Sequence, residues 1–224
     1  AQLRMGVADY CRLGTMIVEG PVPMASKRVR WAAGSDGQFR KIIETQLEPI
    51  SRRLDLWDTW FSPDCGNDHQ RGGGYWVRRM VSRKDLRALR EQPGFSAEDI
   101  DAVLKETPTR VAGAESRVKR TVVNEDSSYE LFIWHGEIEP DRFRDCVCFD
   151  EPELDGEGNA IEQEVERGLV MICNERLVGA LESWLEPGDP MPVSVACWRA
   201  TDDSPYGLGI PDEQEDQQSV VNGA

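Results

Sequence analysis

The order of strand-like and helix-like segments constrains the fold of this chain more than any other feature. A short helical pattern comes first, strand-like segments follow, two consecutive helical patterns lie between Ser82 and Thr107, and strand-like segments then return. A parallel sheet needs a long crossover, usually a helix, between successive strands. Because the helices here are grouped instead, we predict an α+β fold with mainly antiparallel sheets, a helical hairpin insertion and flanking helices.

This order divides the 224 residues into five segments. They are the end of an N-terminal helix at 1–14, an antiparallel β region at 15–75, a strand plus helical hairpin at 76–110, an antiparallel β region with an acidic loop at 111–204, and the start of a truncated helix at 205–224. The chain lacks an initiating methionine and ends within the last helical pattern. We therefore expect it to be a piece of a longer protein.

Strand and turn signals predict the individual strands. In the first β region, Gly-Pro and Gly-Ser-Asp-Gly separate short strands at 15–18, 28–31 and 39–45. In the second β region, strands are expected at 129–134, 146–149, 169–173, 177–181 and 193–198. Asn174-Glu175-Arg176 is interpreted as a hairpin loop between two of them.

Three helix signals are clear. The helical spacing of Leu3, Val7, Tyr10 and Cys11 predicts an amphipathic N-terminal helix that Gly14 ends. In the helical hairpin, Ser82 with Asp85 and Ser96 with Asp99 have the three-residue spacing of a capping box. Near the end of the chain, Pro211 occupies an expected first helical position and is followed by acidic residues, which the helix dipole favours there.

Charge is unevenly distributed along the chain. The net charge is −15, but residues 1–120 have a net charge of +5 (21 basic, 16 acidic) and residues 121–224 a net charge of −20 (5 basic, 25 acidic). Such an acidic half repels DNA phosphates, which disfavours adhesive DNA binding. It is either a solvated surface that keeps the protein soluble or a wall along which DNA passes without sticking.

The longest apolar run, Leu169–Cys173, is too short to span a bilayer, so no membrane partner is expected.

The sequence contains few groups that could perform catalysis. His69 is expected to be exposed in a polar loop, and His135 to close a strand at a turn. The run Asp155–Glu166 matches a calcium loop only in part, because its sixth position is Ala160, and a hairpin tip is favoured. No catalytic, cofactor-binding or metal-binding residue is assigned.

The six cysteines are interpreted as reduced, small apolar residues; they are Cys11, Cys65, Cys146, Cys148, Cys173 and Cys197.

Two surface features each allow two interpretations. A basic cluster could meet phosphate or an acidic neighbour, but the solvent face of a helix is favoured; it comprises Arg78, Arg79, Arg83, Lys84, Arg87 and Arg90. Four of the seven tryptophans are interpreted as core or interface anchors: Trp57, Trp60, Trp184 and Trp198.

Several passages, taken in order, point to one family. They are Leu47–Ile50, Phe61–Asp64, Tyr75–Arg79, Ser82–Arg87, Tyr129–Gly136, Pro192–Trp198, Tyr206-Gly-Leu-Gly-Ile-Pro211 and Gln217–Asn222. Their order and spacing resemble the wing region of the portal proteins of tailed bacteriophages, from about residue 40 onward. The Tyr-Gly-x-Gly-x-Pro passage, which in that family leads into the long stem helix, is the most specific of them. The stem helices, clip, tunnel loop and crown of a portal have no counterpart here.

The resemblance implies a structural role without catalysis. Portal subunits form a homo-oligomeric ring, commonly of twelve copies, at one vertex of the capsid in the virion, after assembly in the bacterial cytoplasm. The terminase drives double-stranded DNA through the ring without sequence recognition, and capsid and tail adaptor proteins bind to it. The basic half of one copy could then meet the acidic half of the next in a head-to-tail contact. Gly207 and Gly209 are expected to let the backbone bend from sheet into stem.

Two alternatives belong to other classes. One is a small metal-dependent hydrolase of a mobile element, in which His69, His135 and several carboxylates would converge on a common point. The other is a phage adaptor or baseplate protein, which is structural but has no DNA tunnel. The hydrolase predicts that the histidines converge, whereas a portal predicts that they are dispersed. A ring with an acidic lumen is expected of a portal and not of an adaptor or baseplate protein.

Overall fold

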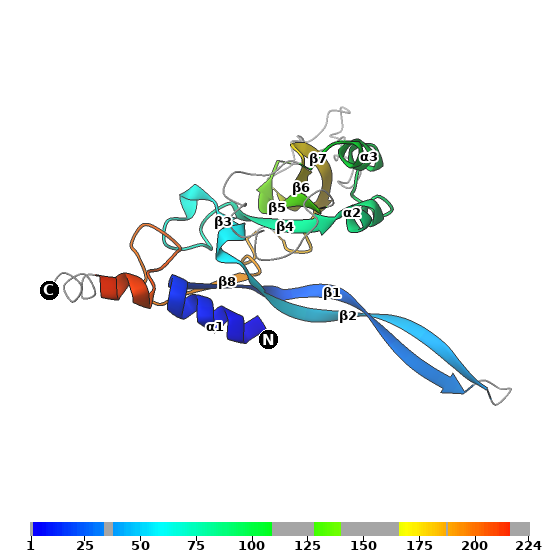
Figure 1. Cartoon of the computed structure of the whole chain (residues 1–224), viewed down its shortest axis with the longest axis horizontal. Coiled ribbons are helices and arrows are strands. Elements are labelled where there is room, and N and C mark those ends of the chain that lie inside the picture. The colour runs from blue at the N-terminus through cyan, green and yellow to red at the C-terminus, as the bar shows by residue number, and fades with distance from the viewer. Residues whose placement is uncertain (1, 34–37, 109–127, 140–165, 187, 216–224) are drawn as a thin grey trace, which may run out of the picture. The chain divides into compact units, whose positions relative to one another are not determined.

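The structure, a computed structural model, describes residues 2–33, 38–108, 128–139, 166–186 and 188–215. Over these residues the fold is α+β, and all paired strands in its two sheets are antiparallel (Figure 1). The chain divides into two compact units, of which the first comprises Ala1–Leu56 and Pro192–Ala224 and the second Trp57–Met191. The expected strand at 146–149 and most of the acidic loop lie outside the described residues.

The first unit contains one helix and a three-stranded sheet. Helix α1 is Gln2–Leu13, and the sheet has the order β2-β1-β8, with β1 at Thr15–Ala33, β2 at Phe39–Leu54 and β8 at Val193–Cys197. Only Thr15–Glu19 of β1 pairs with β8. Beyond this point β1 and β2 continue together as a two-stranded ribbon, which Figure 1 shows extending past β8.

The two short strands predicted within residues 15–31 are wrong as separate elements, because β1 is one strand of 19 residues. Gly20-Pro21 does not end the strand but shifts its register with β2 between Glu19 and Val22, as a β-bulge does. Gly20 has a φ of 124°, and its amide donates a hydrogen bond of 2.7 Å to the carbonyl of Pro192. Glycine suits this position because such a φ is strained for other residues.

The second unit is built on a five-stranded sheet with the order β3-β4-β5-β6-β7. The strands are β3 at Thr59–Phe61, β4 at Gly74–Ser82, β5 at Ser128–Ile138, β6 at Glu166–Cys173 and β7 at Arg176–Glu182, and the 3₁₀ helices η1 at Leu56–Asp58 and η2 at Pro63–Cys65 flank β3. The hairpin between β6 and β7 is one residue tighter than predicted, because Arg176 pairs with Cys173. Asn174 and Glu175 both have a positive φ, which is typical of a two-residue type I′ turn.

The two predicted capped helices form the helical side of this unit. Helix α2 spans Arg83–Leu89 and α3 spans Ala97–Lys105, and the hydroxyls of Ser82 and Ser96 each accept a hydrogen bond of 3.2 Å from the amide three residues later, as predicted. The helices pack on the sheet around one core. Its fully buried side chains are Leu86, Ile100, Val103, Tyr129, Cys173 and Val178.

The Cys173 thiol should be unreactive in the folded protein. The four described cysteines, Cys11, Cys65, Cys173 and Cys197, are free thiols, and burial raises the pKa of Cys173 to about 11. The thiolate is the reactive form, so at pH 8 about 0.1% of Cys173 is ionised against about 10% for a thiol with a pKa of 9. We expect iodoacetamide to alkylate Cys173 at least about 100-fold more slowly in the native chain than in urea. Peptide mass spectrometry measures both rates, and equal rates would contradict its burial in the core.

Candidate assembly interface

The two histidines lie in one aromatic row of the second unit. His135 is inside β5 rather than at a strand end, and its ring stacks on that of Tyr75 with centroids 4.9 Å apart. His69 is partly buried rather than exposed, with its ring 5.7 Å from that of Phe61. Phe61 in turn lies 6.0 Å from Tyr75. Both imidazoles are therefore packed as aromatic rings between neighbouring strands and the adjoining loop.

Among the described residues, the carboxylates do not gather with these histidines into a metal-binding group. In the part of the chain that the structure describes, no group of three or more His, Cys, Asp or Glu side chains could hold a metal ion. The calcium-loop candidate lies almost wholly outside the described residues, which resume at Glu166. The described residues thus offer no site of the kind that a metal-dependent hydrolase needs.

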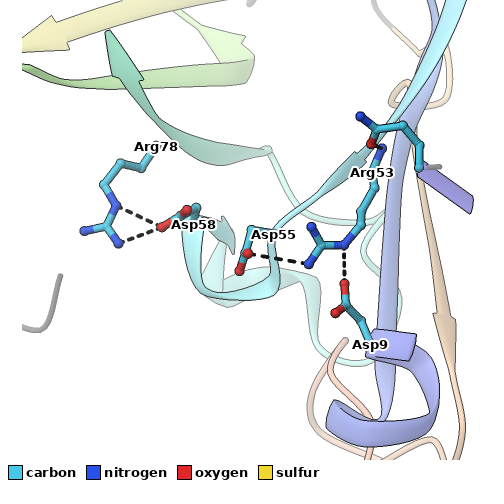
Figure 2. Close-up of polar contacts among 6 residues, drawn as sticks. Asp9, Arg53, Asp55, Asp58 and Arg78 are labelled. Carbon is cyan, nitrogen blue, oxygen red and sulfur yellow. Dashed lines mark hydrogen bonds and ion pairs between the residues drawn. The ribbon is translucent and has the colours of Figure 1, made fainter. Parts of the chain in front are cut away.

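Arg78, from the predicted basic cluster, is a structural residue of the second unit. Its guanidinium donates two hydrogen bonds to Asp58 (Figure 2), of 3.0 and 2.6 Å. It also lies 5.5 Å from the ring centroid of Trp60. It also faces the buried Glu130 at 3.9 Å. The prediction of a solvent-exposed cluster is wrong for Arg78, whose side chain is 10% exposed. On α2, by contrast, Arg83, Lys84 and Arg87 are exposed, as the solvent-face interpretation predicts.

The four tryptophans interpreted as anchors are not in the core. Their exposed fractions are 54% for Trp57, 39% for Trp60, 56% for Trp184 and 42% for Trp198. The core interpretation is therefore wrong, while the interface interpretation stays a prediction. Large exposed aromatic side chains are enriched where a protein contacts a partner.

The ribbon of β1 and β2 has two chemically different faces. Residues paired directly across antiparallel strands point to the same side, and alternate residues point to opposite sides. We call one side the charged face; it includes Arg28, Arg30, Arg40, Glu44 and Glu48, with ion pairs Arg28–Glu48 and Arg30–Glu44. We call the other side the apolar face; it consists of Pro23, Ala25, Lys27, Val29, Trp31, Ala33, Phe39, Lys41, Ile43, Thr45, Leu47 and Pro49. Every residue of the apolar face is exposed.

This face was missed from the sequence, although its signal is there. Apolar residues recur at every second position from Pro23 to Ala33, broken only at Lys27, which is the period of one strand face. Interpreting Gly20-Pro21 as the end of a strand hid this alternation, because it divided one long strand into two short ones.

The connection from α1 to β1 packs against the Tyr206–Pro211 passage, within the first unit. The Gly207 amide donates a hydrogen bond of 2.8 Å to the Thr15 hydroxyl, and the Trp198 amide one of 2.8 Å to the Gly14 carbonyl. A Cβ on Gly207 would lie 2.7 Å from the Arg199 carbonyl oxygen. The chain is helical from 210 to 215, so the helix predicted at Pro211 begins at this junction.

The bend from sheet into stem expected at Gly207 and Gly209 does not depend on a left-handed backbone angle at either residue. Neither has a positive φ; instead, both allow backbone segments to approach closely. A Cβ on Gly209 would lie 2.8 Å from the Arg12 carbonyl oxygen and 2.9 Å from the Gly14 nitrogen. The junction is therefore packed tightly and gives the helix a fixed start.

One arginine ties α1 to the end of β2 in the same unit. Figure 2 shows that the Arg53 guanidinium donates a hydrogen bond to Asp9 of α1 and also contacts Asp55. The Arg53 Nη2 atom lies 3.5 Å from the Asp55 Oδ2 atom. The hydrogen bond to Asp9 raises the pKa of Arg53 above its ordinary value. The Arg53 amide also donates to the Gln2 side chain at 3.2 Å. These contacts hold α1, which precedes the junction, against the sheet.

No protein-family model matches this chain, and no curated protein matches its sequence. Among the described residues, no helix has the length and apolar character needed to cross a membrane.

Proposed function

We propose that this chain is part of a ring-forming structural subunit that surrounds a DNA channel, as the portal of a tailed bacteriophage does. One observation carries the proposal. The Tyr206–Pro211 passage, the most specific part of the resemblance, packs tightly on the α1–β1 connection and leads directly into a helix. A subunit in the wall of a channel needs such a fixed helix start if its stem helix is to point toward the channel.

Charge supports the same proposal. Residues 121–224 have a net charge of −20, which would repel the phosphates of passing double-stranded DNA and prevent adhesion. In this role the partners are further copies of the chain, the terminase, and capsid and tail adaptor proteins at the capsid vertex. The subunit itself performs no chemistry on DNA.

Imaging of the full-length protein tests the proposal. We expect negative-stain electron microscopy and native mass spectrometry to show closed rings, commonly of twelve copies, with a central channel wide enough for duplex DNA. A monodisperse monomer at high concentration, with nuclease activity that depends on a divalent metal, would overturn the proposal in favour of the hydrolase. Rings whose channel is not lined by acidic residues would favour an adaptor or baseplate protein instead.

A further inference from the structure

The apolar face of the ribbon carries several large, exposed apolar side chains. Its largest side chains are Leu47 and Phe39, each 70% exposed, Trp31 at 62%, Ile43 at 58% and Val29 at 54%. The ribbon part of β1, at 23–33, has a length of about 36 Å, and two strands have a width of about 10 Å, so the face covers roughly 350 Å². The largest exposed apolar patch on a typical monomer has a similar area and is often functional.

A covering partner would also stabilise the folded ribbon itself. A two-stranded hairpin is only marginally stable in water, because neither strand buries its apolar side chains. The charged face has its own ion pairs, Arg28–Glu48 at 2.5 Å and Arg30–Glu44 at 3.5 Å, and needs no cover. Covering the apolar face, in contrast, lowers the free energy of the protein, because it removes apolar side chains from water.

Charge favours a second copy of this chain as that surface. The only charged residues on the apolar face are Lys27 and Lys41, both basic. Residues 21–50 have a net charge of +2, whereas the rest of the chain has a net charge of −17, so a second copy offers the opposite sign. The same chain also has an exposed apolar stripe on α1, where Leu3 is 70% and Val7 50% exposed.

We propose that the apolar face of the ribbon binds a neighbouring copy of the chain. In this proposal the ribbon of one copy binds a different surface of its neighbour, so the contact is head-to-tail, and head-to-tail contacts close into rings when the rotation allows. The inference rests on the proposed function for the closed ring, but the contact itself rests on the ribbon's faces. The negative net charge of −15 makes an anionic lipid surface a poorer match than a second copy.

Photo-crosslinking from adjacent positions tests the contact. The photoreactive residue p-benzoylphenylalanine replaces either Ile43, on the apolar face, or Ile42, on the charged face, in the full-length protein. Chains labelled with nitrogen-14 and nitrogen-15 are mixed, assembled and irradiated, and mass spectrometry counts the cross-links between differently labelled chains. We expect position 43 to give at least about 10-fold more of them than position 42, because alternate strand residues face opposite ways.

A pair of double variants provides a second measurement. Val29 and Ile43 are paired across the ribbon, and so are Arg28 and Glu44 on the other face. Val29→Thr with Ile43→Thr keeps β-branched side chains, so the strands should remain while the oligomer dissociates. Arg28→Thr with Glu44→Thr should leave the oligomer intact at the same concentration, as measured by analytical ultracentrifugation.

The outcomes separate this inference from the proposed function. Closed rings in which positions 42 and 43 cross-link equally would overturn the ribbon contact and leave the ring proposal standing. Cross-links from position 43 in an open or dimeric assembly would support the ribbon contact and contradict the ring. A monomer without intermolecular cross-links would overturn both, and binding of the ribbon to lipid vesicles instead would overturn the choice of partner.

Discussion

Gly14→Ala is expected to lower the free energy of unfolding by roughly 3 kcal/mol or more, through left-handed strain and overpacking together. Gly14 has a φ of 76°, which is strained for alanine. A Cβ there would also lie 2.2 Å from the Leu208 carbonyl carbon and 2.5 Å from the Gly209 nitrogen, both backbone atoms. Backbone cannot rotate away as a side chain can, so the Tyr206–Pro211 passage must move off the α1–β1 connection.

Urea unfolding followed by circular dichroism measures the loss, and hydrogen exchange locates it. The Trp198 and Gly207 amides, which donate to Gly14 and Thr15, should exchange much faster in the variant. Gly188→Ala is the matched control, because Gly188 also has a positive φ, 91°, but has nothing within 4 Å of the added Cβ. It should cost only the left-handed strain, about 1–2 kcal/mol. Equal losses in the two variants would mean that the junction is not packed as described.

Arg52→Met is expected to cost roughly 3–5 kcal/mol, because it removes the cation that pairs with a fully buried carboxylate. The Arg52 guanidinium donates a hydrogen bond to Glu19, whose side chain is fully buried at the bulge in β1. Methionine keeps much of the length of the side chain but leaves the carboxylate without this positive charge. The cost is largest where water cannot replace the lost partner.

Two further variants separate charge from packing. Glu19→Gln combined with Arg52→Met removes both charges and should recover most of the loss seen in urea unfolding. Arg28→Met removes a cation from the exposed pair with Glu48 on the same two strands, where it should cost about 1 kcal/mol or less. If the double variant were as unstable as Arg52→Met alone, packing rather than the buried charge would be responsible.

Features that depend on neighbours in the sequence could be predicted. The hydroxyls of Ser82 and Ser96 act within three residues, so their capping roles follow from the local sequence. The grouping of strands and helices likewise predicted the α+β fold and its antiparallel sheets. The histidines were harder to place, because the packing of His135 on Tyr75 depends on the register of β4 and β5.

The sequence by itself determined the class of fold, the helix caps and the alternation along the ribbon, because each depends on residues a few positions apart. Only the tertiary structure decided that Gly20-Pro21 is a bulge, since the Gly20 amide is satisfied by Pro192, 172 positions later. It also decided that Gly207 and Gly209 serve close packing, and that the apolar face of the ribbon is exposed. Alternation tells which residues share a face, but only the arrangement of distant segments tells whether anything covers that face.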